Sequence, residues 1–149
     1  MTTHVVTETV TTVDPITTKV MRANKRRNTG PELIARKMLR ELGYRGYRLD
    51  WGKAPGRPDI AFPGRKIAIF VHGCFWHHCP ECSRDFPKKR RDYWQPKLER
   101  NMERDAQNEA KLEELGWHVI VIWEHELKPK RLDATRERLE AELAPLMGN

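Results

Sequence analysis

A segment in the middle of the chain concentrates the side chains that could do chemistry. Three histidines and three cysteines fall within the 11 residues 72–82, and these are all the cysteines of the protein. Residues 67–71 lead into this segment as a short apolar run, mostly of branched side chains, which predicts a buried strand. A buried strand that ends in metal-ligand and aromatic residues predicts a functional site.

The three cysteines suit a metal site better than a disulfide framework. Their number is odd, and no charged-then-apolar secretory signal opens the chain. Cys74, Cys79 and Cys82 would supply three thiolates, and a tetrahedral zinc ion needs a fourth ligand. His125 is one candidate because it follows a second apolar run, and His78 is the local rival. Such a closed zinc site would be structural, and three reduced cysteines without a metal are the alternative.

A carboxylate at the start of the preceding predicted strand indicates a second metal. In a hairpin the start of one strand meets the end of the next, so Asp59 should lie near His72 and His77. A carboxylate there could hold Mg²⁺, which prefers oxygen ligands, or it could only cap the turn. His77 is the candidate for proton transfer, because the ordinary pKa of histidine lies near working pH. His78 has the same chemistry, and a histidine that only packs or binds zinc is the alternative interpretation.

Large aromatic residues and a run of cations accompany the cysteines. Phe75, Trp76 and Trp94 are flanked by Cys/His or Lys/Arg residues, which predicts that they lie on a loop surface. From there they could enter a stack of bases, although core packing is the commoner role of tryptophan. A basic loop over residues 88–94, which includes Tyr93 and Trp94, is predicted ahead of the second helix. Its cations are Lys88, Lys89, Arg90 and Arg91. Cations next to aromatic side chains are typical of a surface that binds nucleic acid.

The bulk composition supports a polyanionic partner. The chain has 149 residues, a net charge of +7 and a pI near 9.5, so a single domain that binds nucleic acid is expected. No apolar run approaches the ~18 residues of a membrane-spanning helix, which disfavours a membrane partner and favours a cytoplasmic protein. Residues 1–18 are rich in Thr and Val and predict a flexible tail, which leaves residues 19–149 as one domain.

A small mixed α/β architecture must position these residues. Thr29 is the predicted N-cap of the first helix in a capping box with Glu32, and Asp133 is the predicted N-cap of the last. Helices are predicted over about 29–42, 96–115 and 133–146, and strands over 47–51, 59–62, 67–71 and 119–123. Three consecutive strands followed by a helical crossover to a fourth predict a mixed sheet with helices on its faces. The predicted buried stripe of the second helix is Leu98, Met102, Ala106, Leu112 and Leu115.

Several of these motifs, in this order, resemble the very short patch repair (Vsr) DNA mismatch endonucleases. The resemblance covers about residues 19 to 127, and the stretch His72-Gly73-Cys74-Phe75-Trp76-His77 is highly specific to that family. The other motifs are Met21-Arg22-Ala23, Thr29-x-Pro31-Glu32, Gly56-Arg57-Pro58-Asp59, Tyr93-Trp94, Asn101-x-x-Arg104-Asp105 and Leu115-Gly116-Trp117-x-Val119-x-x-x-Trp123-Glu124.

The resemblance implies a restriction-endonuclease-like (PD-(D/E)xK-type) α/β fold, with a mixed sheet flanked by helices, a structural zinc and a catalytic Mg²⁺. Family members nick DNA on the 5′ side of the T in a T:G mismatch left by deamination of 5-methylcytosine. Double-stranded DNA with that mismatch is therefore the implied partner of a monomeric repair enzyme. A functional link to a cytosine-5 DNA methyltransferase and to mismatch-repair proteins is also implied.

The resemblance also implies roles for individual residues. Asp59 and the backbone carbonyl of Val71 would bind Mg²⁺, and His77 would be the catalytic histidine. Glu32 and His72 resemble the residues that hold the water molecules around the metal. The intercalating residues would be Phe75, Trp76 and Trp94, with Met21 inserting from the N-terminal arm.

The chain departs from familiar members of that family at a few positions. Val71 stands where a threonine is common, Cys79-x-x-Cys82 stands where others carry His and Cys, and His125 stands where others often have cysteine. The last two changes preserve a set of four zinc ligands. The strand 67–71 lacks the acidic residue and the lysine that are usual in such nucleases, which agrees with the use of His77 instead.

Two other functions fit parts of the same pattern. A related restriction or defence nuclease would keep these catalytic residues but cut modified or unmismatched DNA. A zinc-dependent DNA-binding module would have no catalytic activity, and the presence of both Asp59 and His77 argues against it.

Overall fold

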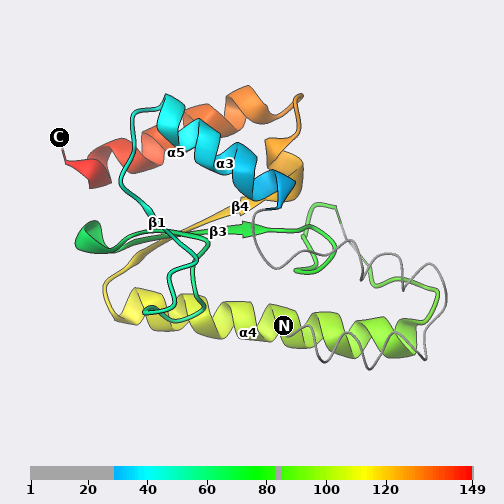
Figure 1. The fold of residues 1–149 in the computed structure, drawn as a ribbon. Coiled ribbons are helices and arrows are strands. Elements are labelled where there is room, and N and C mark those ends of the chain that lie inside the picture. The colour runs from blue at the N-terminus through cyan, green and yellow to red at the C-terminus, as the bar shows by residue number, and fades with distance from the viewer. Residues whose placement is uncertain (1–28, 83–84, 149) are drawn as a thin grey trace.

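The computed structural model describes residues 29–82 and 85–148, and within these ranges the chain forms three α-helices and four strands (Figure 1). The helices are α3 (Gly30–Glu41), α4 (Arg91–Glu114) and α5 (Leu132–Met147). The strands are β1 (Arg48–Leu49), β2 (Ile60–Phe62), β3 (Ile67–His72) and β4 (His118–Trp123). Two short 3-10 helices are η1 (Pro63–Arg65) and η2 (Glu124–Leu127). The predictions for the tail 1–18 and for Met21 lie outside the described residues.

The strands form one mixed sheet in the order β1-β2-β3-β4. The first three pair antiparallel, with Ile60 opposite Ile69, and β4 pairs parallel with β3, with His72 opposite Trp123. The predicted three-strand meander and helical crossover are therefore confirmed, and α4 is the crossover helix. Because parallel strands end at the same edge of a sheet, the segments that follow β3 and β4 emerge side by side.

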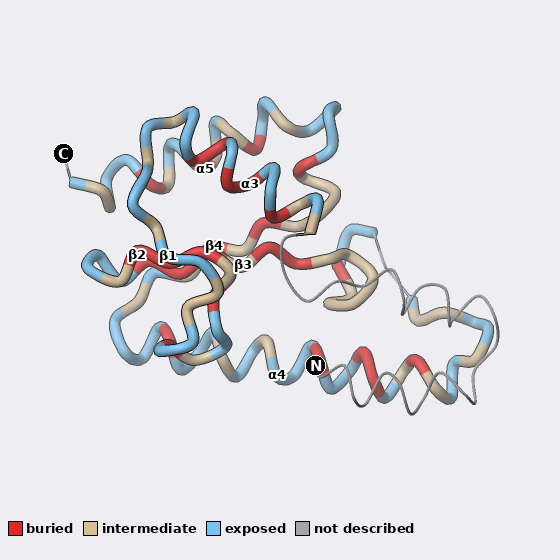
Figure 2. Tube along the Cα trace, viewed as in Figure 1, coloured by how far each residue is buried: buried red, intermediate tan, exposed pale blue. Residues whose placement is uncertain are grey.

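Helices α3 and α5 cover one face of the sheet and enclose the main apolar core, as Figures 1 and 2 show. Its completely buried side chains include Met38, Leu39, Ile67, Ile69, Ile120, Leu139 and Leu143. Thr29 caps α3 as predicted, because its Oγ1 accepts a hydrogen bond from the N–H of Glu32 at 3.3 Å. This cap fixes where the helix begins and so places Glu32 in its first turn.

Helix α4 lies across the opposite face, where the apolar contact is divided into two small clusters (Figure 1). Leu112, near the C-terminal end of α4, packs against side chains of β3 and β4 such as Ala68 and Val119. Leu98, near the other end, packs in a separate cluster with Trp94. The part of α4 between these clusters turns polar side chains toward the sheet edge.

Helix α4 begins earlier than predicted. It starts at Arg91, so Tyr93 and Trp94 belong to the helix and the prediction that they lie in a basic loop is wrong. Trp94 is only 4% exposed, and its packing against Leu98 stabilises the first turns of the helix. Pro96 is tolerated as the sixth residue because it removes only one backbone hydrogen bond there.

The buried side of α4 also differs from the predicted stripe. Leu98 and Leu112 are buried as predicted, but Ala106 is exposed, Met102 is 40% exposed and Leu115 is 53% exposed. The side that faces the protein runs instead through residues 94, 98, 101, 105, 108 and 112. This series keeps helical spacing but has polar residues in its middle, so a search for apolar periodicity misses it.

The end of β1 and the start of α5 also differ from the predicted positions. Strand β1 spans only Arg48–Leu49, both exposed, because Asp50 adopts a left-handed backbone conformation with φ of 49° that ends the extended segment. The N-cap position of α5 is Arg131 and not Asp133, which lies inside the helix. None of the described helices is long and apolar enough to cross a membrane.

Candidate active site

The carboxylate of Asp59 is held where β2 begins, beside the end of β3. Its Oδ2 accepts a hydrogen bond from the N–H of Val71 at 2.7 Å, and its backbone carbonyl accepts one from the N–H of Asp50 at 3.0 Å. Burial raises the pKa of Asp59 to about 7; the hydrogen bond from Val71 opposes this rise, and the nearby charge of Glu32 adds to it. A buried carboxylate with a raised pKa gains stability from a nearby cation.

Two further oxygen donors accompany Asp59. Glu32 is 5% exposed, and its Oε1 lies 3.4 Å from the Nη2 of Arg36. In a strand the N–H and C=O of one residue point to the same neighbour, so the carbonyl of Val71 faces the same side as the N–H that binds Asp59. Carboxylate and carbonyl oxygens are the ligands that Mg²⁺ prefers, so the residues present fit this ion.

His77 is oriented by a carboxylate from helix α4. Its Nδ1 lies 2.5 Å from the Oδ2 of Asp105. A tight turn brings the ring there, because the N–H of His77 donates to the carbonyl of Gly73 at 3.1 Å. When Nδ1 donates its hydrogen to a carboxylate, Nε2 is the nitrogen that can accept a proton, as in other carboxylate–histidine pairs.

His72 lies face to face with His77. The ring centroids are 3.8 Å apart and the ring planes differ by 9°. Burial lowers the pKa of His72 to about 3; His77 lowers it further, and Asp105 opposes the change. His72 is therefore neutral at working pH, so a proton gained by His77 would meet a carboxylate and a neutral ring.

The two histidines and Asp105 lie close enough together to suggest a metal site, but the ring geometry argues against one. A histidine binds a metal ion with a nitrogen lone pair that lies in the plane of its ring. Two nearly parallel rings 3.8 Å apart have no common point in their planes where one ion could lie. The arrangement suits proton transfer better than metal binding.

Asp105 is a candidate site residue to which the sequence analysis gave no role. Its signal was its position, because it follows Asn101 by four residues and precedes Leu112 by seven, which places the three on one face of α4. Asn101 is 7% exposed and donates its Nδ2 hydrogen to the backbone carbonyl of Trp76 at 3.0 Å. Two polar residues on the protein-facing side of a helix are the sequence signal that could have indicated a site residue here.

The loop that leads to Asp59 also rests on α4. Gly56 has a φ of 78°, and a Cβ atom at this position would lie 2.9 Å from the Cβ of Asn108. Only glycine permits both this backbone conformation and this close approach. One face of α4 therefore contacts the aromatic segment, the candidate catalytic histidine and the loop that carries Asp59.

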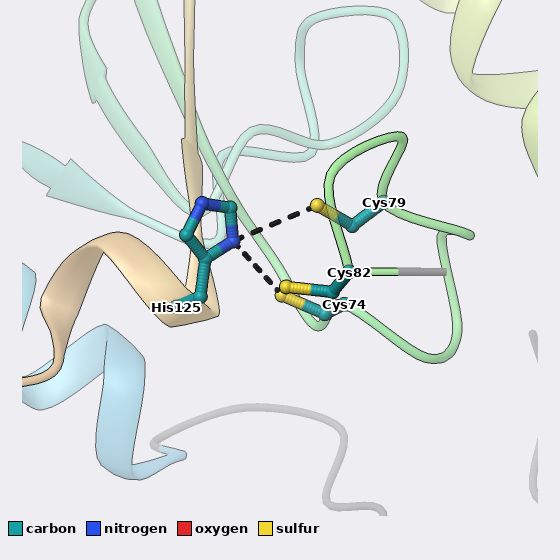
Figure 3. Close-up of side chains that lie close together, drawn as sticks. All are labelled: Cys74, Cys79, Cys82 and His125. Atoms are coloured by element: carbon teal, nitrogen blue, oxygen red, sulfur yellow. Dashed lines mark hydrogen bonds between the residues drawn. The ribbon is translucent and has the colours of Figure 1, made fainter. Parts of the chain in front are cut away.

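Cys74, Cys79, Cys82 and His125 converge beyond the ends of β3 and β4 (Figure 3). Their ligand atoms all lie within 4.8 Å of one another. The Nδ1 of His125 is 3.4 Å from the Sγ of Cys74 and 3.6 Å from the Sγ of Cys79. Burial raises the pKa of the Cys74 thiol to about 12, so a cation is needed to hold it as a thiolate. Three sulfurs and one imidazole form a donor set that fits structural zinc.

His78 takes no part in this cluster. Its ring stacks on Phe86, with the centroids 4.4 Å apart and the planes 11° apart. Its own backbone φ of 52° turns the chain, so it and its neighbour His77 point to different partners. Geometry therefore separates the alternatives: His77 faces Asp105, His78 faces Phe86 and His125 faces the sulfurs.

Phe75, Trp76 and Trp94 form an edge-to-face aromatic cluster. The centroid of Trp94 is 4.8 Å from that of Phe75 and 5.7 Å from that of Trp76. Phe75 and Trp76 are partly buried and pack outside the main core. Trp94 belongs to α4 and is nearly inaccessible, so the expectation that all three lie on a loop surface holds only for the first two.

The predicted cations lie just before α4 and at its first residue. Lys88 and Lys89 are exposed. The guanidinium of Arg90 lies 5.8 Å from the ring centroid of Tyr93, and Arg91, which begins the helix, pairs with a carboxylate at 3.0 Å. The two lysines therefore present their charge to solvent beside the aromatic cluster.

Comparisons with known proteins agree with this arrangement. Residues 13–84 match the family described as DNA mismatch endonuclease Vsr. The type II nicking enzyme V.XorIIP of Xanthomonas oryzae pv. oryzae is 44% identical to this chain, over 85% of it and 90% of the relative. The DNA mismatch endonuclease Vsr of Escherichia coli is 37% identical, over 82% of this chain and 80% of its own. This chain belongs to the DNA mismatch endonuclease Vsr family.

Another Vsr-like relative extends the comparison. The type II nicking enzyme V.NmeAIP of Neisseria meningitidis is 44% identical, over 76% of this chain and 79% of its own length. The resemblance inferred from the sequence motifs is therefore confirmed. The protein is a DNA endonuclease of the Vsr family, built on a mixed α/β sheet with a cysteine–histidine cluster that could hold zinc.

Proposed function

We propose that this Vsr-family endonuclease nicks DNA on the 5′ side of the T in a T:G mismatch left by deamination of 5-methylcytosine. The observation that carries the proposal is a largely buried carboxylate, Asp59, within electrostatic range of His77, a histidine that Asp105 orients. The printed names of the relatives, a mismatch endonuclease and nicking enzymes, support it. A restriction-endonuclease-like fold of the PD-(D/E)xK type is part of the proposal, and the mixed sheet supports it.

Each side chain of the site has a separate role in phosphodiester hydrolysis. Mg²⁺ held by Asp59 and the carbonyl of Val71 would supply charge stabilisation at the scissile phosphate. His77 accepts the proton of the attacking water at Nε2, while Asp105 fixes its tautomer and balances the charge it gains. His72 stays neutral against the ring of His77.

The water molecules around the metal need side chains that hydrogen-bond and orient them. Glu32 is buried in the first turn of α3, and its charge acts on Asp59. His72, at the end of β3, is 8% exposed and stacks on the ring of His77. These two side chains orient water molecules between the carboxylate of Asp59 and the phosphate, in agreement with the roles that the family resemblance implies.

Recognition of the mismatch falls to the aromatic cluster. Phe75 and Trp76 are accessible enough to enter the base stack, which costs least to open at a mispair. Trp94 supports them from α4, since its ring is in contact with both and is itself shielded. Phe75 and Trp76 thus form an aromatic wedge, and Lys88 and Lys89 contact phosphates beside it.

The zinc site is structural in this proposal. Four protein ligands leave no open position for substrate or water. The ion would tie the loop that contains Phe75 and His77 to η2, which carries His125. Zinc would therefore maintain the position of the wedge and the base and take no part in the reaction.

The proposed reaction also suggests the cellular context. The mismatch arises where a cytosine-5 DNA methyltransferase has acted, so we expect a functional link to such an enzyme and to mismatch-repair proteins. The nuclease itself acts as a monomer in this proposal, because one chain supplies the carboxylate, the base and the wedge.

A nicking assay tests the proposed function. The zinc-loaded protein is incubated with Mg²⁺ and duplexes that differ only in T:G or C:G at one site, in several flanking sequences. We expect a single nick in the T strand of the mismatched duplex. Asp59→Ala and His77→Ala should bind this DNA without nicking it, and full activity in both would contradict the site assignment.

The aromatic wedge has a separate readout. Trp76→Ala should lose the preference for the mismatched duplex, because the energy of opening the stack is no longer recovered. Unchanged discrimination would remove Trp76 from recognition. If the parent cuts both duplexes equally, a restriction or defence nuclease is the better description. The printed name of two relatives, type II nicking enzyme, is the observation that favours this second function.

A further inference from the structure

We propose that Glu81 is a positioning residue for the zinc ligand His125 and that Arg131 holds Glu81 in place. The inference rests on the zinc site proposed above. His125 turns its Nδ1 toward the sulfurs, so its hydrogen is carried by Nε2. The Oε1 of Glu81 lies 3.3 Å from this Nε2. Carboxylates in this position fix the ring orientation and the tautomer of metal-binding histidines.

The Nε2 atom of His125 needs such a partner. It is shielded from water, and within the described part of the chain no acceptor meets it in good hydrogen-bond alignment. A buried N–H that has lost water and gains no acceptor is unfavourable. Glu81 is the carboxylate within reach, and a small rotation of its exposed side chain would align the bond.

Arg131 fixes the same carboxylate from the other side. Its Nη1 lies 3.0 Å from the Oε2 of Glu81, so each oxygen of the carboxylate has its own partner. The backbone of Arg131 is itself held, because its N–H donates to the carbonyl of Lys128 at 2.9 Å and its carbonyl accepts from the N–H of Thr135 at 3.0 Å. The contact therefore connects the cysteine loop, η2 and the start of α5.

The charges explain why an arginine accompanies this carboxylate. A zinc ion with three thiolates and a neutral imidazole carries one net negative charge. A second negative charge beside it would be repelled unless a cation offset it. The guanidinium of Arg131 supplies that cation through its ion pair with Glu81. Glu81 can then accept the imidazole hydrogen at little electrostatic cost.

The competing interpretation is that Glu81 and Arg131 form only a surface ion pair. Their side chains are 57% and 48% exposed, and exposed pairs contribute little to stability. The two interpretations differ in what the removal of Glu81 does to the metal. A surface pair would leave zinc affinity unchanged, whereas a positioning residue would lower it.

The experiment uses the full-length zinc-loaded protein and its Glu81→Ala, Glu81→Gln and Arg131→Met variants. Zinc affinity is measured by competition with a chromophoric chelator, and the Nε2 hydrogen of His125 is followed by nitrogen-resolved NMR. We expect Glu81→Ala to weaken zinc binding about tenfold and to speed the exchange of this hydrogen with solvent. Arg131→Met should shift both quantities less, in the same direction. Glu140→Gln, at an exposed glutamate of α5, is the matched control and should change neither.

Glu81→Gln keeps an acceptor without the charge, so it should recover part of the affinity lost in Glu81→Ala. It also provides a folded variant if the alanine variant proves unstable. Zinc affinity within about twofold of the parent in both variants, with unchanged hydrogen exchange, would overturn the inference. A parent protein that binds no zinc would instead refute the zinc site, and that result needs no variant.

Discussion

The two faces of the sheet differ in what covers them. Helices α3 and α5 fill one face with fully buried apolar side chains such as Ile69 and Leu139. Helix α4 meets the other face through two small apolar clusters, and between them Asn101 and Asp105 contact the functional segment. Because apolar burial is the main source of stability, the first face should carry the fold and the second the reaction.

The largest effect should come from Asp105→Asn on the α4 face. Asparagine cannot balance the charge of a protonated His77 or enforce its tautomer, so single-turnover nicking of a T:G duplex should slow about 1000-fold. The melting temperature should change little. Glu103→Gln, at an exposed position of the same helix, is the matched control. A rate within about tenfold of the parent would remove Asp105 from the reaction.

Leu139→Ala tests the other face. This side chain is completely buried between α5 and the sheet, so its truncation should lower the free energy of unfolding by about 3 kcal/mol. Nicking per folded molecule should stay the same. Denaturant unfolding measures the free energy of unfolding. The nicking rate is measured at denaturant concentrations below the unfolding transition. A loss of rate comparable with that of Asp105→Asn would show that the faces are not separate in function.

Asp59→Asn should stabilise the protein when Mg²⁺ is left out. The pKa of Asp59 rises from 3.8 to about 7 on folding, so between these pH values the folded protein holds a proton that the unfolded chain has lost. The parent is therefore destabilised as pH rises through this window, and the effect is complete above it. The variant lacks this ionisation, so its advantage should grow from about pH 4 to 7 and then stay constant, at about 2 kcal/mol.

Unfolding of the Asp59→Asn variant and the parent across this pH range provides the measurement. Partial access of water to the carboxylate keeps the expected difference below the full value of the shift. Addition of Mg²⁺ should stabilise the parent more than the variant. A difference in stability that does not depend on pH would contradict the burial of a charge at this position.

The smallest effect is expected for Met102→Lys on the outer side of α4. Its side chain is 40% exposed, so the substitution should change the free energy of unfolding by less than about 0.5 kcal/mol. Leu98→Ala, four residues earlier, should cost about 2–4 kcal/mol because that side chain is buried. If both variants lost the same free energy of unfolding, Met102 would be buried like Leu98, as apolar spacing predicts.

The sheet could be predicted because its signals are local. Short apolar runs gave the strands, Thr29 gave the start of α3, and a hairpin placed Asp59 beside the end of β3. The cysteine spacing gave three members of one cluster, and the parallel pairing of β3 and β4 explains why His125 joins them. In each case the sequence neighbours and the simplest topology were sufficient.

The polar face of α4 could not be predicted in the same way. His77 and Asp105 are 28 residues apart, and nothing in the local pattern of either residue indicates the other. Asn101 and Asp105 occupy buried-side positions where periodicity expects apolar side chains, so three of the five residues of the predicted stripe, Met102, Ala106 and Leu115, lie on the exposed side instead. Trp94 was placed on a loop because Pro96 was taken to begin the helix.

The contacts of Asn101, Asp105 and Asn108 have a mechanical consequence. They occupy about two turns of one straight element, spaced by its fixed rise of ~1.5 Å per residue. The helix therefore fixes, relative to one another, the segment of Trp76, the ring of His77 and the loop that leads to Asp59, which are the proposed wedge, base and metal ligand. A ligand or mutation that shifts α4 along its axis would displace all three contacts together. Duplex opening and strand cleavage would then be lost at the same time.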